Sequence, residues 1–185
     1  MNMFDLIRDR RTHKVFTGEP VTNEQLERLL ELATWAPNHR MTEPWRFFVV
    51  GSEQVETFAQ VVVEAIGEEA PPKMQAKRTM LSRRLPRLGA FVSVARRRLE
   101  DAHRDQEDYG ACCCAVQNLL LAATAMGLGS FWSTGGVFDL PPVRDYLGMG
   151  SDLERVASIW LGTPAEEARS VRRPATEWTH WVGRD

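Results

Sequence analysis

The most constraining feature of the sequence is one long and almost wholly apolar segment, DYGACCCAVQNLLLAATAMGLGS, at residues 108–130. Its length approaches that of a membrane-spanning helix, but Gln117, Asn118 and Thr124 interrupt it. Its many alanines suit close packing within a protein, and Gly127 is a typical residue for ending a helix. A helix that is apolar nearly all round must be covered by other elements. We therefore predict a central buried helix in a chain long enough to build a core around it.

Shorter patterns predict the elements that surround this helix. Thr22 and Gln25 have the spacing of a capping box, and the apolar face that follows must end before Pro37. Bulky and β-branched runs closed by glycine are typical of strands. The sequence predicts helices over residues 2–11, 22–36, 52–66 (capped by Ser52), 108–126 and 141–147, and strands over residues 44–50, 89–95, 130–134 and 155–162. The remaining C-terminal residues predict an extended tail, and the mixture predicts an α+β fold in a single domain over residues 1–185.

The basic stretch RDRRTHK at residues 8–14 has several possible explanations. A net charge of −2 argues against general nucleic-acid binding, which usually needs a basic domain. The stretch lacks the apolar core of a secretory signal, and the acidic residues around it argue against a transit peptide. Two explanations stay open on the residues alone: a solvated basic surface at a helix end, and a site for an anionic cofactor.

Motifs that carry chemistry by themselves are missing from the sequence. The three cysteines are consecutive, Cys112–Cys114, so they predict neither a disulfide framework nor a metal site, and we expect buried apolar packing in a reducing, cytoplasmic location. The four histidines are scattered, which predicts no bound metal. There is no phosphate-binding loop, dinucleotide fingerprint or nucleophile elbow. If the chain is an enzyme, a bound cofactor supplies the chemistry.

Four blocks in order resemble a known family: RRTHKVFTGEPV, LLELATWAPNHRMTEPWRFFVV, DYGACCCAVQNLLLAATAMGLGSFWSTG and a late RRP. Together they span nearly the whole chain, and they resemble the FMN-dependent nitroreductases, above all the small YdjA-like branch. The resemblance implies a central, mostly antiparallel sheet flanked by helices. It also implies a homodimer that exchanges its C-terminal tails and holds FMN at the subunit interface.

The resemblance explains the basic stretch as a cofactor site. Arg10, Arg11 and Thr12 would contact non-covalent FMN, because guanidinium groups grip phosphate oxygens in pairs and a hydroxyl adds a short donor. Lys14 would lie near the N1/O2 edge of the flavin, where a cation stabilises the negative charge of the reduced ring. A basic residue of the tail would bind the phosphate as well. We expect Arg173, with Arg172 as the near alternative.

Two further segments are implied to reach the cofactor. In PNHRMTEPW the chain carries His39 and Glu43, where larger family members often have serine, asparagine and glutamine. In the YdjA-like branch these positions reach FMN that is bound mainly by the other subunit. In FWSTG, the resemblance implies that Trp132, Ser133 and Thr134 line the flavin ring through backbone and side-chain groups. The region 67–87 belongs to the variable substrate face, and its specificity is not readable.

The function implied by the resemblance is that of an oxidoreductase which uses NAD(P)H and FMN to reduce nitroaromatics, quinones or similar small acceptors by a ping-pong mechanism. An alternative is a flavin-binding carrier or redox sensor without efficient turnover. A third, nucleic-acid binding through RRLPR and ARRRLE, conflicts with the charge balance, and we expect neither nucleic-acid nor membrane partners.

Overall fold

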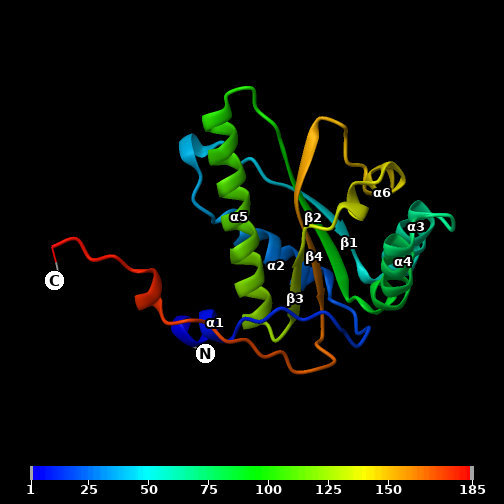
Figure 1. The fold of residues 1–185 in the computed structure, drawn as a ribbon, viewed down its shortest axis with the longest axis horizontal. Coiled ribbons are helices and arrows are strands. Elements are labelled where there is room, and N and C mark those ends of the chain that lie inside the picture. The colour runs from blue at the N-terminus through cyan, green and yellow to red at the C-terminus, as the bar shows by residue number, and fades with distance from the viewer. Residues whose placement is uncertain (1, 184–185) are drawn as a thin grey trace.

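A single four-stranded sheet organises the fold, which a computed structural model describes for residues 2–183 (Figure 1). The strands are β1 (Arg46–Val50), β2 (Ala90–Arg97), β3 (Gly129–Ser133) and β4 (Leu153–Gly162), in the order β1-β2-β4-β3. Every pairing is antiparallel. The α+β class with a mostly antiparallel sheet is therefore confirmed. β1 and β3 are left as the two edge strands of the sheet.

Helices cover both faces of the sheet (Figure 1). They are α1 (Met3–Asp9), α2 (Asn23–Thr34), α3 (Val55–Ile66), α4 (Pro72–Arg84), α5 (Ala102–Ala125) and α6 (Pro141–Leu147). α2 and α5 pack together over one face, whereas α3, α4 and α6 lie over the other. α1 packs against α5 away from the sheet.

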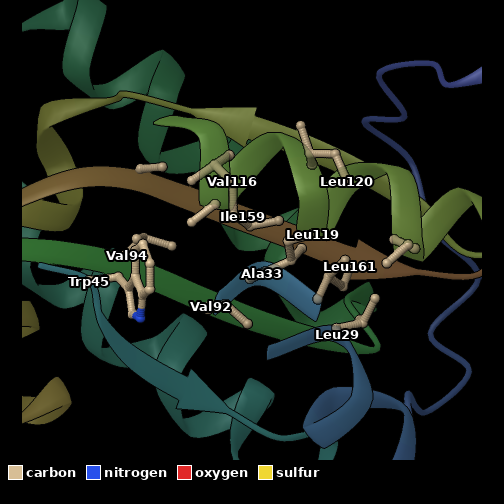
Figure 2. Packing of buried hydrophobic residues seen from close by; sticks show 14 of the residues in the cluster. Leu29, Ala33, Trp45, Val92, Val94, Val116, Leu119, Leu120, Ile159 and Leu161 are labelled. Carbon is tan, nitrogen blue, oxygen red and sulfur yellow. The ribbon is translucent and has the colours of Figure 1, made fainter. Parts of the chain in front are cut away.

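Each face of the sheet has its own hydrophobic core. The first core, beneath α2 and α5, is mainly aliphatic, and Figure 2 shows Leu29, Ala33, Val92, Val94, Val116, Leu119, Leu120, Ile159 and Leu161 converging in it. The second core, beneath α3, α4 and α6, is built around aromatic rings: Phe16, Phe58, Phe91, Phe138 and Trp160. The buried central helix predicted from the sequence is thus α5, lying over the first core.

The helix ends predicted from the sequence are largely confirmed. Thr22 and Gln25 form the expected capping box at the start of α2. At the end of α5, Gly127 adopts a φ of 76°, which L-residues rarely adopt, and the next N–H donates back to the carbonyl of Ala123 at 2.8 Å. The start of α5 differs from the prediction. Asp101 caps the helix, which begins six residues before Asp108 with an added polar turn.

One sequence-based expectation about the elements is corrected, and two further features of the structure were not predicted. Ser52 does not cap α3 with its side chain, because residues 52–54 form a separate 3-10 turn. The region 67–87 contains helix α4, which begins with Pro72 in its first turn, where the missing N–H costs nothing. The apolar stripe of α1 does not face the core, since Met3, Phe4 and Ile7 are all exposed.

The cysteines also differ from the expectation of uniform burial. Cys112 is fully buried in the first core, and burial raises the pKa of its thiol to about 12. Cys113 is half-buried, while Cys114 is exposed on the outer face of α5. Successive residues of a helix point about 100° apart, so three consecutive side chains cannot share one environment.

The chain after β4 runs back along the base of the molecule before leaving it. Backbone hydrogen bonds join Thr17 to Thr163 and Ala165 to Val15, so the segments that follow α1 and β4 meet there. Beyond Ser170 the tail is exposed and projects away from the body, with one 3-10 turn at Ala175–Trp178 (Figure 1). Within residues 2–183, each helix is too short or too polar to cross a bilayer.

Candidate cofactor-binding site

The end of α1, α5 and the tail enclose a cleft of about 530 Å³. α1 forms because Asn2 caps it, the side-chain oxygen accepting the Asp5 N–H at 3.0 Å. The helix stops at Arg10, where the backbone becomes extended. The residues that line the cleft, here called the first arginine cleft, are Ile7, Arg8, Arg10, Arg11, Gln117, Ser170 and Arg172.

The first arginine cleft gathers positive charge that no ion pair within residues 2–183 compensates. The ion pairs formed among residues 2–183 include none of Arg8, Arg10, Arg11 and Arg172. Arg11 folds back to donate to the carbonyl of Arg10 at 2.9 Å and to that of Arg8. Burial lowers the pKa of Arg10, and the charges of Arg172 and Arg11 lower it further. An anion bound here would relieve the repulsion and accept charge-assisted hydrogen bonds.

An extended segment leads from this cleft along the edge of β3. Thr12 pairs in parallel with Ser130, and the His13 N–H donates to the Ser130 carbonyl at 2.9 Å. The approach requires glycine at position 129, since a Cβ there would lie 3.1 Å from His13 Cβ. Burial lowers the pKa of the His13 imidazole. Thr12 is exposed beside the two arginines that precede it.

Lys14 lies against the second-core face of β3. Its Nζ is 5.5 Å from the ring centroid of Phe131. Alternation along the strand puts Trp132 on the opposite face, against the first core, where its indole N–H is buried without an acceptor among residues 2–183. The Trp132 side chain therefore points away from Lys14. Ser133 returns to the Phe131 side, and Thr134 is exposed just beyond the strand.

Helix α4 adds a residue to this face that sequence reasoning missed. The Ser133 hydroxyl accepts the Gly135 N–H at 3.3 Å, which shapes the turn after β3. A Cβ at Gly135 would lie 3.0 Å from Nζ of Lys77, so the amine reaches this turn. The sequence signal was the Pro-Pro pair at 71–72, which marks a helix start.

His39 and Glu43 belong to a strained loop rather than to the first arginine cleft. Arg40, Met41 and Glu43 have φ values of 55°, 53° and 45°, a conformation that costs non-glycine residues about 1–3 kcal/mol each. The loop is held to α5 by a hydrogen bond of 2.7 Å from Thr42 to the buried Asp108. Strain that the surrounding contacts maintain is typical of a functional segment.

The strained loop and the first arginine cleft contact different parts of α5. Nδ1 of His39 is 3.2 Å from the carboxylate of Glu107, whereas the cleft reaches α5 at Gln117. Ten helical residues correspond to about 15 Å. One subunit therefore does not bring His39 and Glu43 to its own arginines.

In the tail, Arg172 lines the cleft, whereas Arg173 stacks on Trp178 at 4.0 Å and pairs with a neighbouring glutamate.

Comparison with known proteins identifies the family. Residues 7–162 match the nitroreductase family, which covers most of the chain. The chain belongs to the nitroreductase family. It is 34% identical to YfhC of Bacillus subtilis and 30% identical to YdjA of Escherichia coli K12, each named as an NAD(P)H nitroreductase. The alignments cover 91% of this chain in both cases, and 87% and 91% of the two relatives.

Solved nitroreductase structures have the same fold. A nitroreductase-like protein from Bacillus cereus superimposes with a TM-score of 0.87 at 28% identity, covering 99% of this chain and 97% of that one. A nitroreductase from Desulfovibrio desulfuricans, solved in complex with FMN, gives a TM-score of 0.77 at 25% identity, covering 100% and 99%. The expected family, its YdjA-like relatives and the nitroreductase-like fold are confirmed.

Proposed function

We propose that this protein is an oxidoreductase that holds FMN non-covalently and uses NAD(P)H to reduce small acceptors. The observation that carries the proposal is the first arginine cleft, where Arg10 is partly desolvated and repelled by Arg172 and Arg11. None of the cleft's arginines forms an ion pair within residues 2–183. These donors fit a dianionic phosphate. The FMN complex of the Desulfovibrio relative and the names of YfhC and YdjA support the same cofactors here.

The residues that would hold FMN extend from the first arginine cleft to β3. Arg10 and Arg172 would bind the phosphate, and Thr12 would add a hydroxyl donor. Lys14 would stabilise negative charge at the ring edge, because its ammonium lies beside the half-buried ring of Phe131. The backbone of β3 and its following turn would orient the flavin ring. When bound, FMN supplies the two-electron chemistry, so no protein acid or base is required.

We propose nitroaromatics and quinones as acceptors, because the relatives' names point to nitro compounds and quinones accept two electrons in the same way. Donor and acceptor would use one open face in turn, which gives ping-pong kinetics. Arg11 would stabilise the end of α1 rather than contact substrate, since its guanidinium already donates to the carbonyls of Arg8 and Arg10. The unpaired cysteines suit a reducing cytoplasmic location.

We further propose that the active unit is a homodimer. Large apolar side chains are exposed on α1, the strained loop and the tail, among them Phe4 at 74%, Met41 at 74% and Trp178 at 66%. A partner subunit would cover them, because large exposed apolar surface on a soluble protein marks an interaction site. β1 is an edge strand to which a partner's tail could add. The same assembly would carry His39 and Glu43 to flavin held by the other chain.

The test is a visible spectrum of the purified protein, followed by anaerobic titration with NADPH and NADH. We expect the absorbance of oxidised flavin at one FMN per subunit, bleached by one equivalent of donor and restored by a quinone. Bound FMN that neither nicotinamide reduces would favour the carrier or sensor alternative. Protein that binds no FMN at micromolar concentration would refute the proposal.

A further inference from the structure

A second arginine cleft, of about 410 Å³, lies between the end of α4 and the segment that follows α1. It is lined by Val15, Phe16, Arg83, Arg84 and Arg87 and shares no residue with the first arginine cleft. The ion pairs among residues 2–183 include none of its three arginines. These arginines belong to the RRLPR run, which the proposed function leaves unexplained.

The backbone that carries the arginines of the second cleft is anchored by buried neighbours. Arg84 ends α4, and Arg87 ends the 3-10 turn that follows it. Between and after them, Leu85 and Leu88 are 0% and 2% exposed in the second core. Two buried leucines therefore anchor the backbone from which the arginines extend at the cleft. Binding there would not have to order a flexible loop first.

The floor of the second cleft is apolar and rigid. The Val15 carbonyl accepts the Ala165 N–H at 3.1 Å, and Phe16 bridges to Pro164. Phe16 is 2% exposed, while Val15 is half-buried. An apolar floor beside guanidinium groups is suited to a ligand with a flat ring and phosphate groups. Arginine can stack on such a ring as well as bind phosphate oxygens.

A simpler explanation accounts for only part of this arrangement. Basic residues in the last turn of a helix are favoured by the helix dipole, and Arg83 and Arg84 occupy that turn of α4. Arg87 lies beyond the helix, at the end of the next turn. The dipole also does not explain why all three arginines line one cleft together with Val15 and Phe16.

The second cleft lies within reach of the proposed flavin site. Val15 directly follows Lys14, and one extended residue spans at most about 3.5 Å. On α4, Lys77 precedes Arg84 by seven residues, which places both on one face about 10 Å apart. Because the amine of Lys77 reaches the Gly135 turn, the cations of α4 continue from the end of β3 to the cleft.

We propose that the second arginine cleft binds the phosphorylated adenosine end of the dinucleotide electron donor. This inference rests on the proposed function, which requires such a donor. The nicotinamide end would then extend toward Lys14 and β3. Three arginines suit a diphosphate together with a further phosphate on the adenosine ribose, so the cleft favours NADPH over NADH.

The test measures equilibrium binding to the FMN-loaded protein by calorimetry, using NADP⁺, NAD⁺ and inorganic phosphate as probes. We expect wild-type protein to bind NADP⁺ more tightly than NAD⁺. In Arg83→Ala/Arg87→Ala, and separately in Arg84→Gln, NADP⁺ should bind about tenfold to a hundredfold more weakly for each arginine–phosphate hydrogen bond that the substitution removes. The matched control is Arg98→Ala, an exposed arginine outside both clefts, which should change neither affinity.

The flavin affinity of each variant separates this inference from the proposed function. Unchanged FMN affinity with weakened NADP⁺ binding supports the cleft as a donor site. Unchanged NADP⁺ affinity in both variants overturns the inference while the proposed function stands. FMN affinity that falls with NADP⁺ affinity, or inorganic phosphate that binds as tightly as NADP⁺, also overturns it. Wild-type protein without bound FMN would overturn both.

Discussion

Arg172 and Arg173 are adjacent in the sequence but lie in different surroundings, so they form a matched pair for testing the phosphate site. Arg172 lines the first arginine cleft and lowers the pKa of Arg10 by charge repulsion. Arg173 stacks on Trp178 at 4.0 Å and lies 3.4 Å from the carboxylate of Glu177. We predict that Arg172→Ala weakens FMN binding and that Arg173→Ala does not.

The expected magnitude follows from the contacts. A charge-assisted hydrogen bond contributes about 1.5–3 kcal/mol, which corresponds to about a tenfold to hundredfold change in affinity. Removing Arg172 also relieves its repulsion on Arg10 in the flavin-free protein, so we expect the lower end, about tenfold to thirtyfold. Arg173 is two-thirds exposed, and loss of an exposed stack costs about 0.5–1 kcal/mol within the tail itself. The Arg173→Ala substitution should therefore weaken FMN binding by less than about threefold.

The assay is quenching of FMN fluorescence on titration into flavin-free protein at low and moderate salt. The Arg172→Ala variant should also show a smaller salt dependence, because one charged group that binds the phosphate has been removed. Circular dichroism melting of both variants provides the control for folding. If Arg173→Ala weakened FMN more than Arg172→Ala, the first arginine cleft would not be the phosphate site.

Four further predictions address stability, assembly and kinetics. The hydrogen bonds from Arg96 and from the Leu99 N–H lower the pKa of Asp105 to about 2, below its ordinary 3.8. This carboxylate therefore stabilises the fold above about pH 4, and its contribution is lost as the pH falls toward 2. The urea midpoint of Asp105→Asn should drop less than that of the wild type over this pH range, and equal drops would contradict this. Leu119→Ala removes a side chain that is 0% exposed in the first core and should cost about 2–5 kcal/mol in urea unfolding, whereas a loss under 1 kcal/mol would mean that the core collapses around the cavity. A chain ending at Ala175 lacks the exposed Trp178 and Trp181 and should lose dimer stability and FMN affinity together, measured by light scattering and flavin titration; loss of one without the other would separate the interface from the site. For wild-type protein, initial-rate lines at several quinone concentrations should be parallel, and intersecting lines would count against a shared site.

Local patterns with a defined hydrogen-bond role were predictable from the sequence. The capping box of α2 and the glycine end of α5 follow from side-chain and backbone chemistry within a few residues. Helix α4 was not predictable from periodicity, because Leu81 is its only fully buried residue within the described chain and its other positions are mostly basic or polar. Met74 and Met80 also pack against the second core but stay only partly buried, so these few contacts leave no clear amphipathic pattern in the sequence.

The site was predictable in its residue types but not in its assignments. The apolar stripe of α1 has the correct spacing for packing, yet a sequence does not distinguish a core face from a face left for a partner. The choice between Arg172 and Arg173 depends on the path of a tail without regular structure, where no period fixes the direction of a side chain. The second arginine cleft combines residues some seventy positions apart, which only tertiary structure brings together.

The meeting of the segments that follow α1 and β4 has a consequence for synthesis in the cell. Arg10 leaves the ribosome early, but Arg172 follows about 160 residues later, which takes roughly 10–30 s at ordinary translation rates. The strand edge that holds His13 and the segment that holds Val15 are also made late. A nascent chain therefore lacks the complete first arginine cleft, and we expect flavin loading to follow translation. Flavin supply would then affect the stability of completed subunits rather than the folding of growing ones.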